Sequence, residues 1–386
     1  MAEPHIEATS LANWRTAPFN RSSFSRVREI IPTGNITCSP GGVDPLPRST
    51  RNLAALAIKS PLGSQTTLAD FIDNTATDAL MVLRRGAVVY EWYRTPAAQA
   101  APHIVFSVSK SITAILAGVL HGDGVLDPDA PVTSYIPEAH GSAYADATVR
   151  HVLDMTVSLS FIEDYINPDA TFLRYRAASG FNPRPAGSDL TLQKFLVTLE
   201  KDRHQHGEIF RYQSPNSDML GWIIERAGRK RFHELLSERI WQPMGAAADA
   251  YVTLDPAGAP RTAGGICVTI GDLARFGEML RNRGAAGGRQ IVPGAWIDDI
   301  RFGGSTEPWL KGDMRNFMPV CRYRSKWYNR TDADSFMAVG IHGQWLAIDH
   351  SADLVIAKQS SQALPVEDRV DHLHLAAFDA LAQELK

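Results

Sequence analysis

The chain has 386 residues, of which 44% are hydrophobic and 21% are charged, a balance typical of globular proteins with a sizeable core. Its formal net charge is −3 and it contains no block of like charge, so the charge pattern predicts no binding to nucleic acid or to an anionic membrane surface. The three cysteines, Cys38, Cys267 and Cys321, form neither a disulfide framework nor a metal-ligand spacing.

The N-terminal part of the chain predicts neither export nor a separate domain. The first ten residues, MAEPHIEATS, lack the basic and apolar regions of a secretory signal, and the longest apolar run, 112–120, is too short to cross a bilayer. We therefore expect a cytoplasmic protein with reduced thiols and no membrane partner. Residues 1–65 are rich in Pro, Arg, Ser and Gly, which favours an irregular N-terminal segment packed on the body.

Local patterns place strands towards the two ends of the chain and helices in the middle. A short helix is expected at 68–74, and β-branched and aromatic residues on both sides of Arg84-Arg85-Gly86 predict a hairpin over 78–93. Apolar periodicity predicts further helices at 149–155, 192–199, 219–227, 232–240, 271–281, 293–301 and 371–385, and further strands at 336–341, 345–348 and 354–358. This order favours an α/β domain made of residues 66–120 and 265–386, with a mostly helical domain inserted at 121–264.

The stretch 106–120, FSVSKSITAILAGVL, predicts an apolar helix that begins at a Ser-x-x-Lys motif. A helix that begins at Ser107 places Ser107 and Lys110 on one face, beside unpaired backbone N–H groups. This combination supplies a nucleophile, a base and anion-stabilising donors, which acyl transfer needs. The alternative is a plain N-cap serine followed by a solvated lysine. Because Lys110 is the only charge between His103 and His121, we expect it to be desolvated.

Two later segments carry groups that could act with this pair. Tyr212 lies in FRYQSPNSD (210–218), and a phenol can share a proton with a nearby lysine if cations depress the phenol's pKa. The alternative is a loop tyrosine whose hydroxyl is satisfied locally. In VGIHGQ (339–344), glycines surround Ile341, whose N–H could join that of Ser107 in an oxyanion hole. An ordinary strand with a glycine bulge is the alternative here.

Three other features have simpler explanations than a metal or cofactor site. The Asp- and Gly-rich exit of the Ser107 helix, 121–128, does not match the spacing of an EF-hand. The pairs His204/His206 and His372/His374 lack the carboxylate or cysteine pattern that would complete a metal site, so we predict neither metal nor cofactor. His374 could instead line the pocket. Residues 161–190 are expected to form a long loop, and a loop of that length in a compact domain is often functional, for example as a lid.

Taken together, the Ser-x-x-Lys motif, a tyrosine about 105 positions later and a late glycine-rich strand resemble the serine-reactive class C β-lactamase superfamily, which also holds D-peptidases and family VIII esterases. The resemblance continues in GDGVLDPDAPVTSYIPE (122–138), VLDMTVSLSF (152–161) and TAGGICVTIGDLARFGEML (262–280). Within the superfamily, SLANWRTAPFNRSSFSRVREIIPT (10–33), EDYINPDA (163–170) and GIHGQ (340–344) resemble the 6-aminohexanoate-dimer hydrolases, which are nylon-oligomer amidases.

The resemblance implies a β-lactamase/transpeptidase-like fold, with an antiparallel sheet flanked by helices and an inserted, mostly helical domain. It implies that Ser107 is the nucleophile, that Lys110 and Tyr212 handle protons, and that the backbone N–H groups of Ser107 and Ile341 form the oxyanion hole. The residues expected to surround the substrate are Tyr165, Ser214, Gly340 and His342.

The sequence departs from the superfamily pattern at two places. The usual Tyr-x-Asn is not met, because Ser214 holds the place of the asparagine, and we expect Ser214 to support Lys110. The usual Lys-Thr-Gly strand motif, whose cation grips a substrate carboxylate, is also missing if Gly340 is its glycine. If His342 stands there instead, a weaker and pH-dependent cation remains. Either way, we expect a poor partner for the carboxylate of a β-lactam.

We therefore expect a serine hydrolase that cleaves amide or ester bonds of small linear substrates through an acyl-enzyme, without a cofactor and without a nucleic-acid partner. A homodimer is compatible with the sequence. The alternatives are a short-chain carboxylesterase, a weak β-lactamase, and a catalytically silent member of the fold that only binds ligands.

Overall fold

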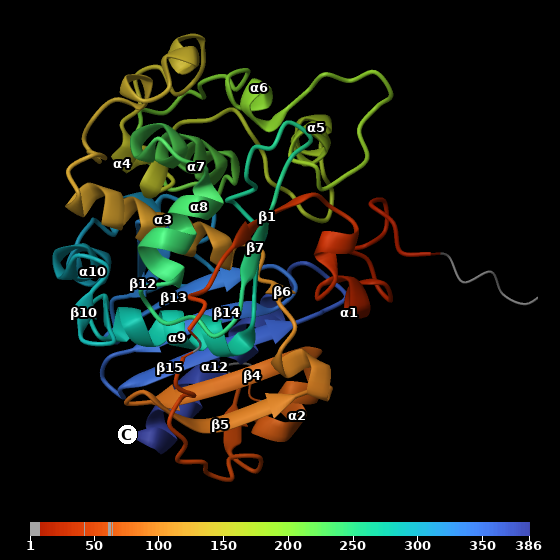
Figure 1. The fold of residues 1–386 in the computed structure, drawn as a ribbon, viewed down its shortest axis with the longest axis vertical. Coiled ribbons are helices and arrows are strands. Elements are labelled where there is room, and N and C mark those ends of the chain that lie inside the picture. Colours follow the sequence, from red (N-terminus) through yellow and green to blue (C-terminus); the bar gives the residue numbers. More distant parts are fainter. Residues whose placement is uncertain (1–7, 42, 61–62, 64) are drawn as a thin grey trace, which may run out of the picture.

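A seven-stranded antiparallel sheet built from both ends of the chain forms one layer of the protein (Figure 1). The computed structural model describes residues 8–41, 43–60, 63 and 65–386. The sheet order is β11-β12-β13-β14-β15-β4-β5, so the late strand β15 pairs with the early strand β4 inside the sheet. The strands are β4 (Thr77–Arg84), β5 (Ala87–Tyr93), β11 (Cys321–Arg324), β12 (Trp327–Arg330), β13 (Ser335–Gly340), β14 (Gln344–Asp349) and β15 (Leu354–Ser360). The predicted hairpin over 78–93 and the predicted contribution of both ends are confirmed.

Helices cover both faces of this sheet. Successive side chains along a strand point to opposite faces, and in this sheet both faces carry apolar side chains that need to be covered. On β15, Val355 and Ala357 join the hydrophobic cluster that includes α9 (Ile270–Arg281). Ile356, between them in sequence, joins the cluster that includes α12 (Asp368–Leu385) and α2 (Leu68–Asn74). Both faces of the central strands are therefore buried, which explains why β15 is apolar along most of its length.

A second, smaller sheet lies beside the first, in the order β1-β7-β8-β6. Its strands are β1 (Thr33–Ile36), β6 (His103–Ile104), β7 (Ala250–Thr253) and β8 (Ile266–Val268). The N-terminal segment is thus not wholly irregular, because β1 pairs with β7. Trp14, Phe24 and Val27 of the same segment are buried in one cluster with Phe106 and Tyr251. The segment therefore packs directly behind the residue that precedes Ser107.

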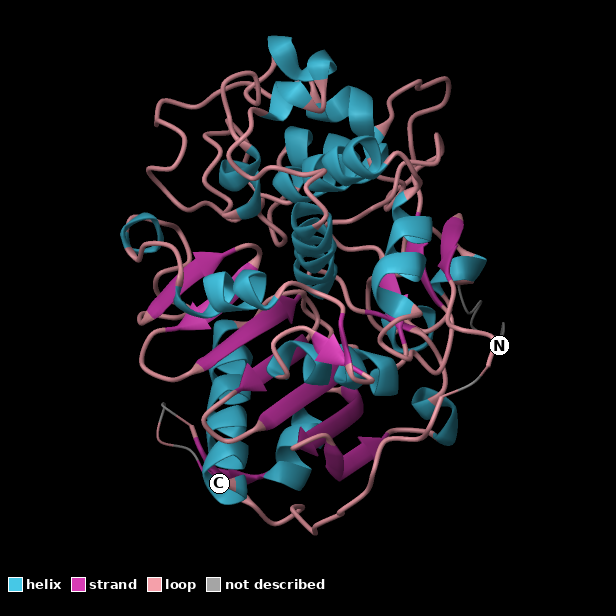
Figure 2. Ribbon diagram, turned by 60° about the vertical axis from the view of Figure 1, so that its left-hand side comes forward, coloured by secondary structure: helices cyan, strands magenta, loops and turns pink. Residues whose placement is uncertain are grey.

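The remaining helices gather on the far side of α3 (Val108–Gly122) from the large sheet (Figure 2). They include α4 (Val149–Leu153), α5 (Ala170–Ala178), α6 (Leu192–Leu196), α7 (Pro215–Gly228) and α8 (Phe232–Leu236). The helix α5 lies within the segment 161–190 that was expected to be a loop, so that expectation is wrong. Because only Phe172, Tyr175 and two alanines of α5 are buried, the helix shows little of the apolar periodicity that predicts one.

Shorter elements complete the described part of the chain. The two-stranded ribbons are β2 (Ala57–Lys59) with β3 (Gln65–Thr67), and β9 (Ala285–Ala286) with β10 (Arg289–Gln290). The short helices are α1 (Asn20–Ser23), α10 (Gly294–Phe302) and α11 (Glu307–Leu310). No helix in the described part of the chain combines the length and the apolar character needed to cross a lipid bilayer.

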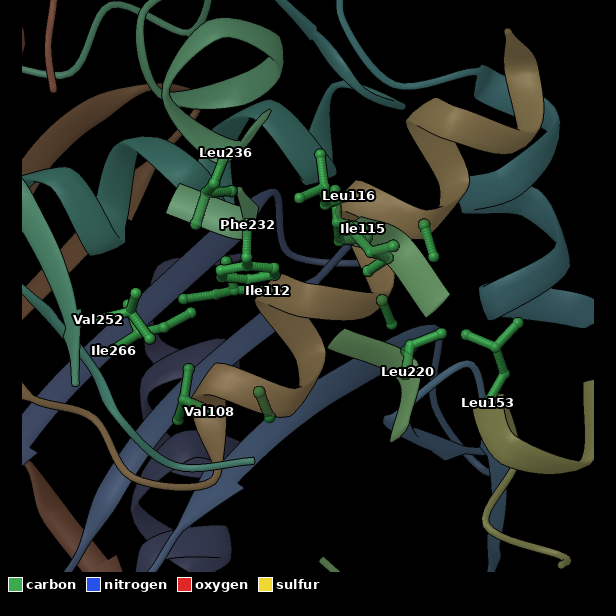
Figure 3. Packing of buried hydrophobic residues seen from close by; sticks show 14 of the residues in the cluster. Val108, Ile112, Ile115, Leu116, Leu153, Leu220, Phe232, Leu236, Val252 and Ile266 are labelled. Atoms are coloured by element: carbon green, nitrogen blue, oxygen red, sulfur yellow. The ribbon is translucent and has the colours of Figure 1, made fainter. Parts of the chain in front are cut away.

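The helix α3 passes through the middle of the molecule, between the large sheet and the helical layer (Figure 2). Every side chain from Val108 to Leu120 is buried. Its apolar contacts come from several elements, as Figure 3 shows for Leu153 of α4, Leu220 of α7, Phe232 and Leu236 of α8, Val252 of β7 and Ile266 of β8. A helix clamped in this way holds its N-terminus rigidly, and Ser107 lies at that N-terminus.

We propose that the chain divides as its sequence suggests, into an α/β domain (66–120 with 265–386), a mostly helical domain (121–264) and an N-terminal segment (1–65). The layering of the large sheet and the α4–α8 helices in Figures 1 and 2 supports this division. In that arrangement α3 belongs to the α/β domain but contacts α7 of the helical domain more than any other helix.

Candidate active site

Ser107 lies at the N-terminus of α3 but does not act as a simple helix cap. Its side chain makes no capping hydrogen bond, and the hydroxyl instead accepts a hydrogen bond from Lys110 Nζ at 2.7 Å. Phe106, immediately before it, has a φ of +39°, a backbone conformation that a bulky residue adopts only under constraint. This turn directs the chain into the helix so that the Ser107 hydroxyl faces a cavity. The alternative of a plain N-cap is thus not what the structure contains.

Lys110 is desolvated, as its sequence context predicted. Its side chain is 1% exposed, and Nζ donates to the Ala263 carbonyl at 2.6 Å as well as to Ser107. Burial lowers the pKa of Lys110 to about 7, with a smaller contribution from the Arg261 charge, while the Glu163 carboxylate acts in the opposite direction. In a large fraction of the protein molecules, Lys110 is therefore a neutral amine near pH 7, and a neutral amine can accept the proton of Ser107.

The carbonyl that holds Lys110 is itself fixed by a buried ion pair. The Ala263 N–H donates to Asp218 Oδ1 at 2.8 Å, and Asp218 lies on α7. The other carboxylate oxygen accepts from Tyr175 and from the Arg261 guanidinium. Both charges are almost fully buried and pair with each other, so the pair is expected to hold one geometry. The helix α7 thus positions Lys110 through the backbone of Ala263.

Tyr212 reaches the same place from the segment before α7. Lys110 Nζ lies 5.0 Å from the centroid of the Tyr212 ring, and Tyr212 lines the cavity next to Ser107. Burial and the Glu163 charge raise the pKa of Tyr212 well above its usual value, although contact with the Ser107 hydroxyl opposes this shift. The expectation that neighbouring cations depress the pKa of Tyr212 is therefore wrong. The phenol keeps its proton, and it is a donor rather than a base in the free protein.

Gly340 allows β13 to approach the N-terminus of α3 very closely. A Cβ atom added there would lie 2.6 Å from the Val105 carbonyl and 3.1 Å from the Ser107 nitrogen, so no side chain fits. The next residue, Ile341, also lines the cavity. Among the described residues, no group accepts a hydrogen bond from the N–H of Ser107 or from that of Ile341. Two free donors on adjacent segments are the arrangement that an oxyanion hole requires.

These groups share one cavity of about 550 Å³. The structure brings together five residues that the sequence singled out, Ser107, Tyr165, Tyr212, Gly340 and Ile341, around this cavity. The cavity is bounded further by the apolar side chains of Phe161, Met314, Phe317 and Val339 and, at its rim, by Asp313, Asp368 and Asp371. Its size and its mixed lining are typical of sites for small molecules.

Glu163 connects two of the predicted residues and was not itself singled out from the sequence. Its carboxylate accepts hydrogen bonds from the Tyr165 hydroxyl, from the Ser214 hydroxyl at 2.6 Å and from the Ser214 N–H at 2.5 Å. Ser214 therefore supports Glu163 and makes no hydrogen bond to Lys110, which corrects the role expected for it. Glu163 begins the segment EDYINPDA (163–170), whose resemblance to the 6-aminohexanoate-dimer hydrolases pointed to this region, but no spacing along the chain relates Glu163 to Ser214.

His342 is not a substrate-binding cation, and this prediction is also wrong. Its ring is 3% exposed, packs against Phe24 and Phe106, and contacts the Gln362 carbonyl through Nδ1 at 2.7 Å. Burial lowers the pKa of His342 to about 4, so the ring is neutral near pH 7. His342 has a φ of +61° at the turn after Ile341, and this turn directs its side chain into the aromatic cluster behind Ser107 rather than into the cavity.

The histidine pairs serve local structure. His206 contacts Asp146 and the Ser158 N–H, and His204 contacts Arg211. His374 is fully buried and stacks on Trp345, with its ring centroid 5.2 Å away, and it does not line the cavity. Throughout the described ranges, no three His, Cys, Asp or Glu side chains are grouped as they would be around a metal ion.

Comparison with known proteins agrees with this geometry. Residues 65–381 match the model of the Beta-lactamase family. The chain is 35% identical over 353 residues to the 6-aminohexanoate-dimer hydrolase of Paenarthrobacter ureafaciens, covering 91% of this chain and 88% of that protein.

Solved structures show the same relationship at the level of the fold. A candidate 6-aminohexanoate-dimer hydrolase from Bacillus anthracis superposes with a TM-score of 0.89 at 26% identity, covering 100% of this chain and 99% of that one. A family VIII carboxylesterase superposes with a TM-score of 0.59 at 18% identity, covering 81% of this chain and 95% of that one, which shows a shared fold alone. The expected β-lactamase/transpeptidase-like fold is thereby confirmed. The chain belongs to the Beta-lactamase family and is a serine hydrolase of that superfamily.

Proposed function

We propose that this hydrolase cleaves the amide bonds of small linear substrates through an acyl-enzyme formed on Ser107. The observation that carries the proposal is the contact between Lys110 Nζ and the Ser107 hydroxyl, made in a site that keeps the amine dry. A hydroxyl becomes a nucleophile when a base within hydrogen-bonding distance can remove its proton. A lysine meets that condition near neutral pH only when its pKa is lowered, as it is here.

The reaction follows from the positions of the groups. Neutral Lys110 takes the proton of Ser107 while the serine oxygen attacks the substrate carbonyl, and the N–H groups of Ser107 and Ile341 receive the oxyanion. The tetrahedral intermediate collapses as the leaving nitrogen gains a proton from Tyr212, whose phenol is then restored from the Lys110 ammonium. Water, deprotonated by the same pair, attacks the ester and releases the acid and free Ser107.

The cavity and the relatives suggest the class of substrate. A relative that is 35% identical over most of the chain is named for hydrolysis of the 6-aminohexanoate dimer, whose amide lies between two short methylene chains. The walls beside Ser107, formed by Phe161, Phe317 and Val339, offer apolar surface to such chains. We therefore propose linear ω-amino acid oligomers and similar unbranched amides as substrates.

A short-chain carboxylesterase is the second candidate. The Tyr165 hydroxyl, which faces the cavity, is already donated to Glu163, so it offers no proton to a leaving nitrogen. The alcohol of an ester can depart as an alkoxide and depends less on a proton donor than the nitrogen of an amide does, which favours ester cleavage by the same groups. A β-lactamase activity has less support, because His342 is neutral and buried, and Val339 supplies no cation for the carboxylate of a β-lactam.

Replacement of the nucleophile tests the proposal. Ser107→Ala should abolish hydrolysis of the linear 6-aminohexanoate dimer and of a matched ester, with the same thermal unfolding midpoint within a few degrees, since only one small hydroxyl is lost. Ser111→Ala, on the same helix, removes a hydrogen bond to the Lys326 carbonyl outside the cavity and should retain turnover. Wild-type rates in the Ser107→Ala protein would exclude this assignment. The ratio of ester to amide turnover in the wild type separates the two candidate functions.

A further inference from the structure

We propose that Tyr328 is a positioning residue for the acid step of the reaction. Its hydroxyl donates a hydrogen bond to the phenolate that Tyr212 becomes when it protonates the leaving group. This inference rests on the proposed function, because it assigns a partner to the proton donor of that reaction. Tyr328 lies on β12 and was not singled out from the sequence. It reaches the site from a hairpin at one edge of the large sheet, far from Tyr212 along the chain.

The Tyr328 ring lies beside the Tyr212 ring, and both residues line the cavity that contains Ser107. The two ring centroids are 6.5 Å apart and the ring planes are inclined by 20°, so the rings are nearly parallel. Tyr328 is only 3% exposed. A second buried phenol is therefore placed next to the proton donor, inside the cavity in which the reaction would take place.

The Tyr328 hydroxyl has a weak partner in the free protein. It donates to Met314 Sδ at 3.7 Å, and a thioether sulfur is a weak hydrogen-bond acceptor. Burial raises the pKa of Tyr328 well above its usual value, so the phenol keeps its proton and remains a donor. A buried donor without a strong acceptor costs free energy, and an acceptor that becomes negatively charged during the reaction would remove this cost.

Tyr212 needs such a donor because its surroundings oppose the charge that it acquires. Burial and the Glu163 charge raise the pKa of Tyr212. Contacts with two hydroxyls, those of Ser107 and Tyr328, act in the opposite direction. The Ser107 hydroxyl cannot help when the leaving group departs, since its proton has already passed to Lys110 and its oxygen carries the acyl group. Of the two hydroxyls, the one on Tyr328 still has a proton to donate.

The step is balanced without a net change at Tyr328. As the bond from the acyl carbon to the leaving nitrogen breaks, the nitrogen keeps the electron pair and takes the Tyr212 proton. The resulting phenolate accepts the hydrogen bond from Tyr328 until Lys110 returns a proton to it. Hydrogen bonds to a charged acceptor are stronger than those between neutral groups, so the contact stabilises this step more than it stabilises the free protein.

Neighbouring aromatic rings hold the Tyr328 ring independently of its hydroxyl. Edge-to-face contacts come from Tyr323, Trp309 and Phe317, whose ring centroids are 4.9, 5.9 and 5.8 Å away. In the sheet, Tyr328 pairs with Met337 of β13. Tyr328→Phe therefore removes the hydroxyl while these contacts remain, and the thermal unfolding midpoint should stay close to that of the wild type.

The test is the dependence of the rate on the leaving group. We would measure kcat/KM, which reports acylation alone, for p-nitrophenyl acetate, ethyl acetate and the linear 6-aminohexanoate dimer. The p-nitrophenolate ion leaves without a proton, so Tyr328→Phe should keep this kcat/KM within about twofold of the wild type. For the dimer, whose amine needs the proton, kcat/KM should fall by about ten- to hundredfold. Ethyl acetate should show an intermediate loss.

Tyr323→Phe is the matched control, because it removes a buried phenol hydroxyl from the same hairpin. Tyr323 pairs with Tyr328 across the two strands, but it lines a separate cavity of about 210 Å³. This variant should keep the wild-type kcat/KM for all three substrates. A second comparison starts from Tyr212→Phe. Because Tyr328 acts through the Tyr212 oxygen, adding Tyr328→Phe to that variant should change kcat/KM by less than about twofold.

The possible outcomes separate this role from the proposed function. Equal losses on all three substrates, or an unchanged kcat/KM for the dimer, would overturn the role of Tyr328 and leave the hydrolase assignment intact. A further loss in the Tyr212→Phe background would do the same. If the wild type cleaves the esters but not the dimer, the amide assignment fails, and the ratio of ethyl acetate to p-nitrophenyl acetate turnover decides the role of Tyr328. A wild type that hydrolyses none of the three would overturn both.

Discussion

Lys110 combines two properties that rarely occur together, near-complete burial and contact with the Ser107 hydroxyl, which we propose that it deprotonates. Two opposing effects set the pKa of Lys110. Burial lowers its pKa, and Glu163 partly restores it, so the value of about 7 lies where an amine can both take and return a proton. Tyr212 responds oppositely to the same surroundings and stays protonated. One residue is thus suited to begin as a base and the other to begin as an acid.

The pKa of Lys110 predicts the pH dependence of the reaction. Because the lowered pKa makes the amine neutral above about pH 7, kcat/KM should rise with pH through that value and approach a plateau near pH 8. Below it, the rate should fall about tenfold per pH unit as the ammonium accumulates. Initial rates with a neutral ester substrate, measured from pH 5 to 9, provide the check. An acidic limb centred above pH 9 would show that Lys110 is not the base.

Replacement of Glu163 provides a second test, measured in the same pH dependence of kcat/KM. Its charge raises the pKa of Lys110, so Glu163→Gln should move the acidic limb to lower pH, while the rate at the plateau changes through the loss of its contacts with Tyr165 and Ser214. A limb that stays at the wild-type pH, or moves upward, would mean that Glu163 acts only on structure.

At the scale of elements, the site depends on the contact between the end of β13 and the start of α3. The sequence patterns predicted both elements but not the contact between them, since the strand brings no side chain to that contact. What fixes the distance is the missing side chain of Gly340, which sets the backbone of β13 against Val105 and Ser107. The two proposed oxyanion donors, the N–H groups of Ser107 and Ile341, therefore come close together because these two backbones are in contact.

The substitution Gly340→Ala should separate the end of β13 from the N-terminus of α3. A methyl group at 2.6 Å from the Val105 carbonyl forces the strand away, with an expected loss of about 1–3 kcal/mol of stability from overpacking and a fall in kcat of about a hundredfold or more if one oxyanion donor is displaced. Gly271→Ala in α9 is the control, because nothing lies within 4 Å of its added methyl group. Wild-type kcat in Gly340→Ala would contradict the assigned oxyanion hole.

The face of the large sheet that packs against α2 and α12 contains a buried lysine that has no part in the proposed reaction. Lys358 of β15 is fully buried, its Nζ donates to the Ser360 hydroxyl, and its charge lies over the Phe71 ring of α2. Burial lowers the pKa of Lys358 to about 7. Between that value and the unfolded pKa of about 10.4, the unfolded chain binds the extra proton, so this group weakens the folded state most at and below pH 7.

Lys358→Met should therefore stabilise the protein. After the lost hydrogen bond to Ser360 is counted, we expect a gain of about 1–3 kcal/mol at pH 7, and a smaller gain at pH 9.5, where the wild-type lysine is neutral in the fold. Urea denaturation at the two pH values gives both numbers. A variant that is less stable at pH 7, or a gain that grows with pH, would show that the cation is well accommodated.

At the scale of the whole molecule, the site joins segments that are far apart in the chain. The Ser107–Lys110 pair follows from helical spacing, and so it could be predicted directly. The positions of Tyr212 and Ile341 relative to it came from a family resemblance, because nothing local ties residues more than a hundred positions apart. Glu163 and the Ala263 carbonyl escaped prediction for the same reason, since their roles exist only after three segments have packed together.

Local features of the sequence explain why some elements of the fold were not predicted. The hairpin of β11 and β12 has only four residues in each strand, and β12 does not alternate apolar and polar residues. Its turn at Ser325 and Lys326 has positive φ at both positions without the glycine or asparagine that marks such turns. The helix α5 buries too few side chains to show a period. Burial of His342 likewise reversed its expected role, because its turn directs the ring away from the cavity.

The most direct test of the central claim is the chemical identity of the intermediate. The protein would be mixed with p-nitrophenyl acetate at pH 7.5, quenched in acid within the first turnovers, and analysed by intact mass and peptide mapping. One acetyl group is expected on the Ser107 peptide of the wild type and none on that of Ser107→Ala. Turnover without any acylated Ser107 peptide, or acylation of a different residue in both proteins, would contradict it.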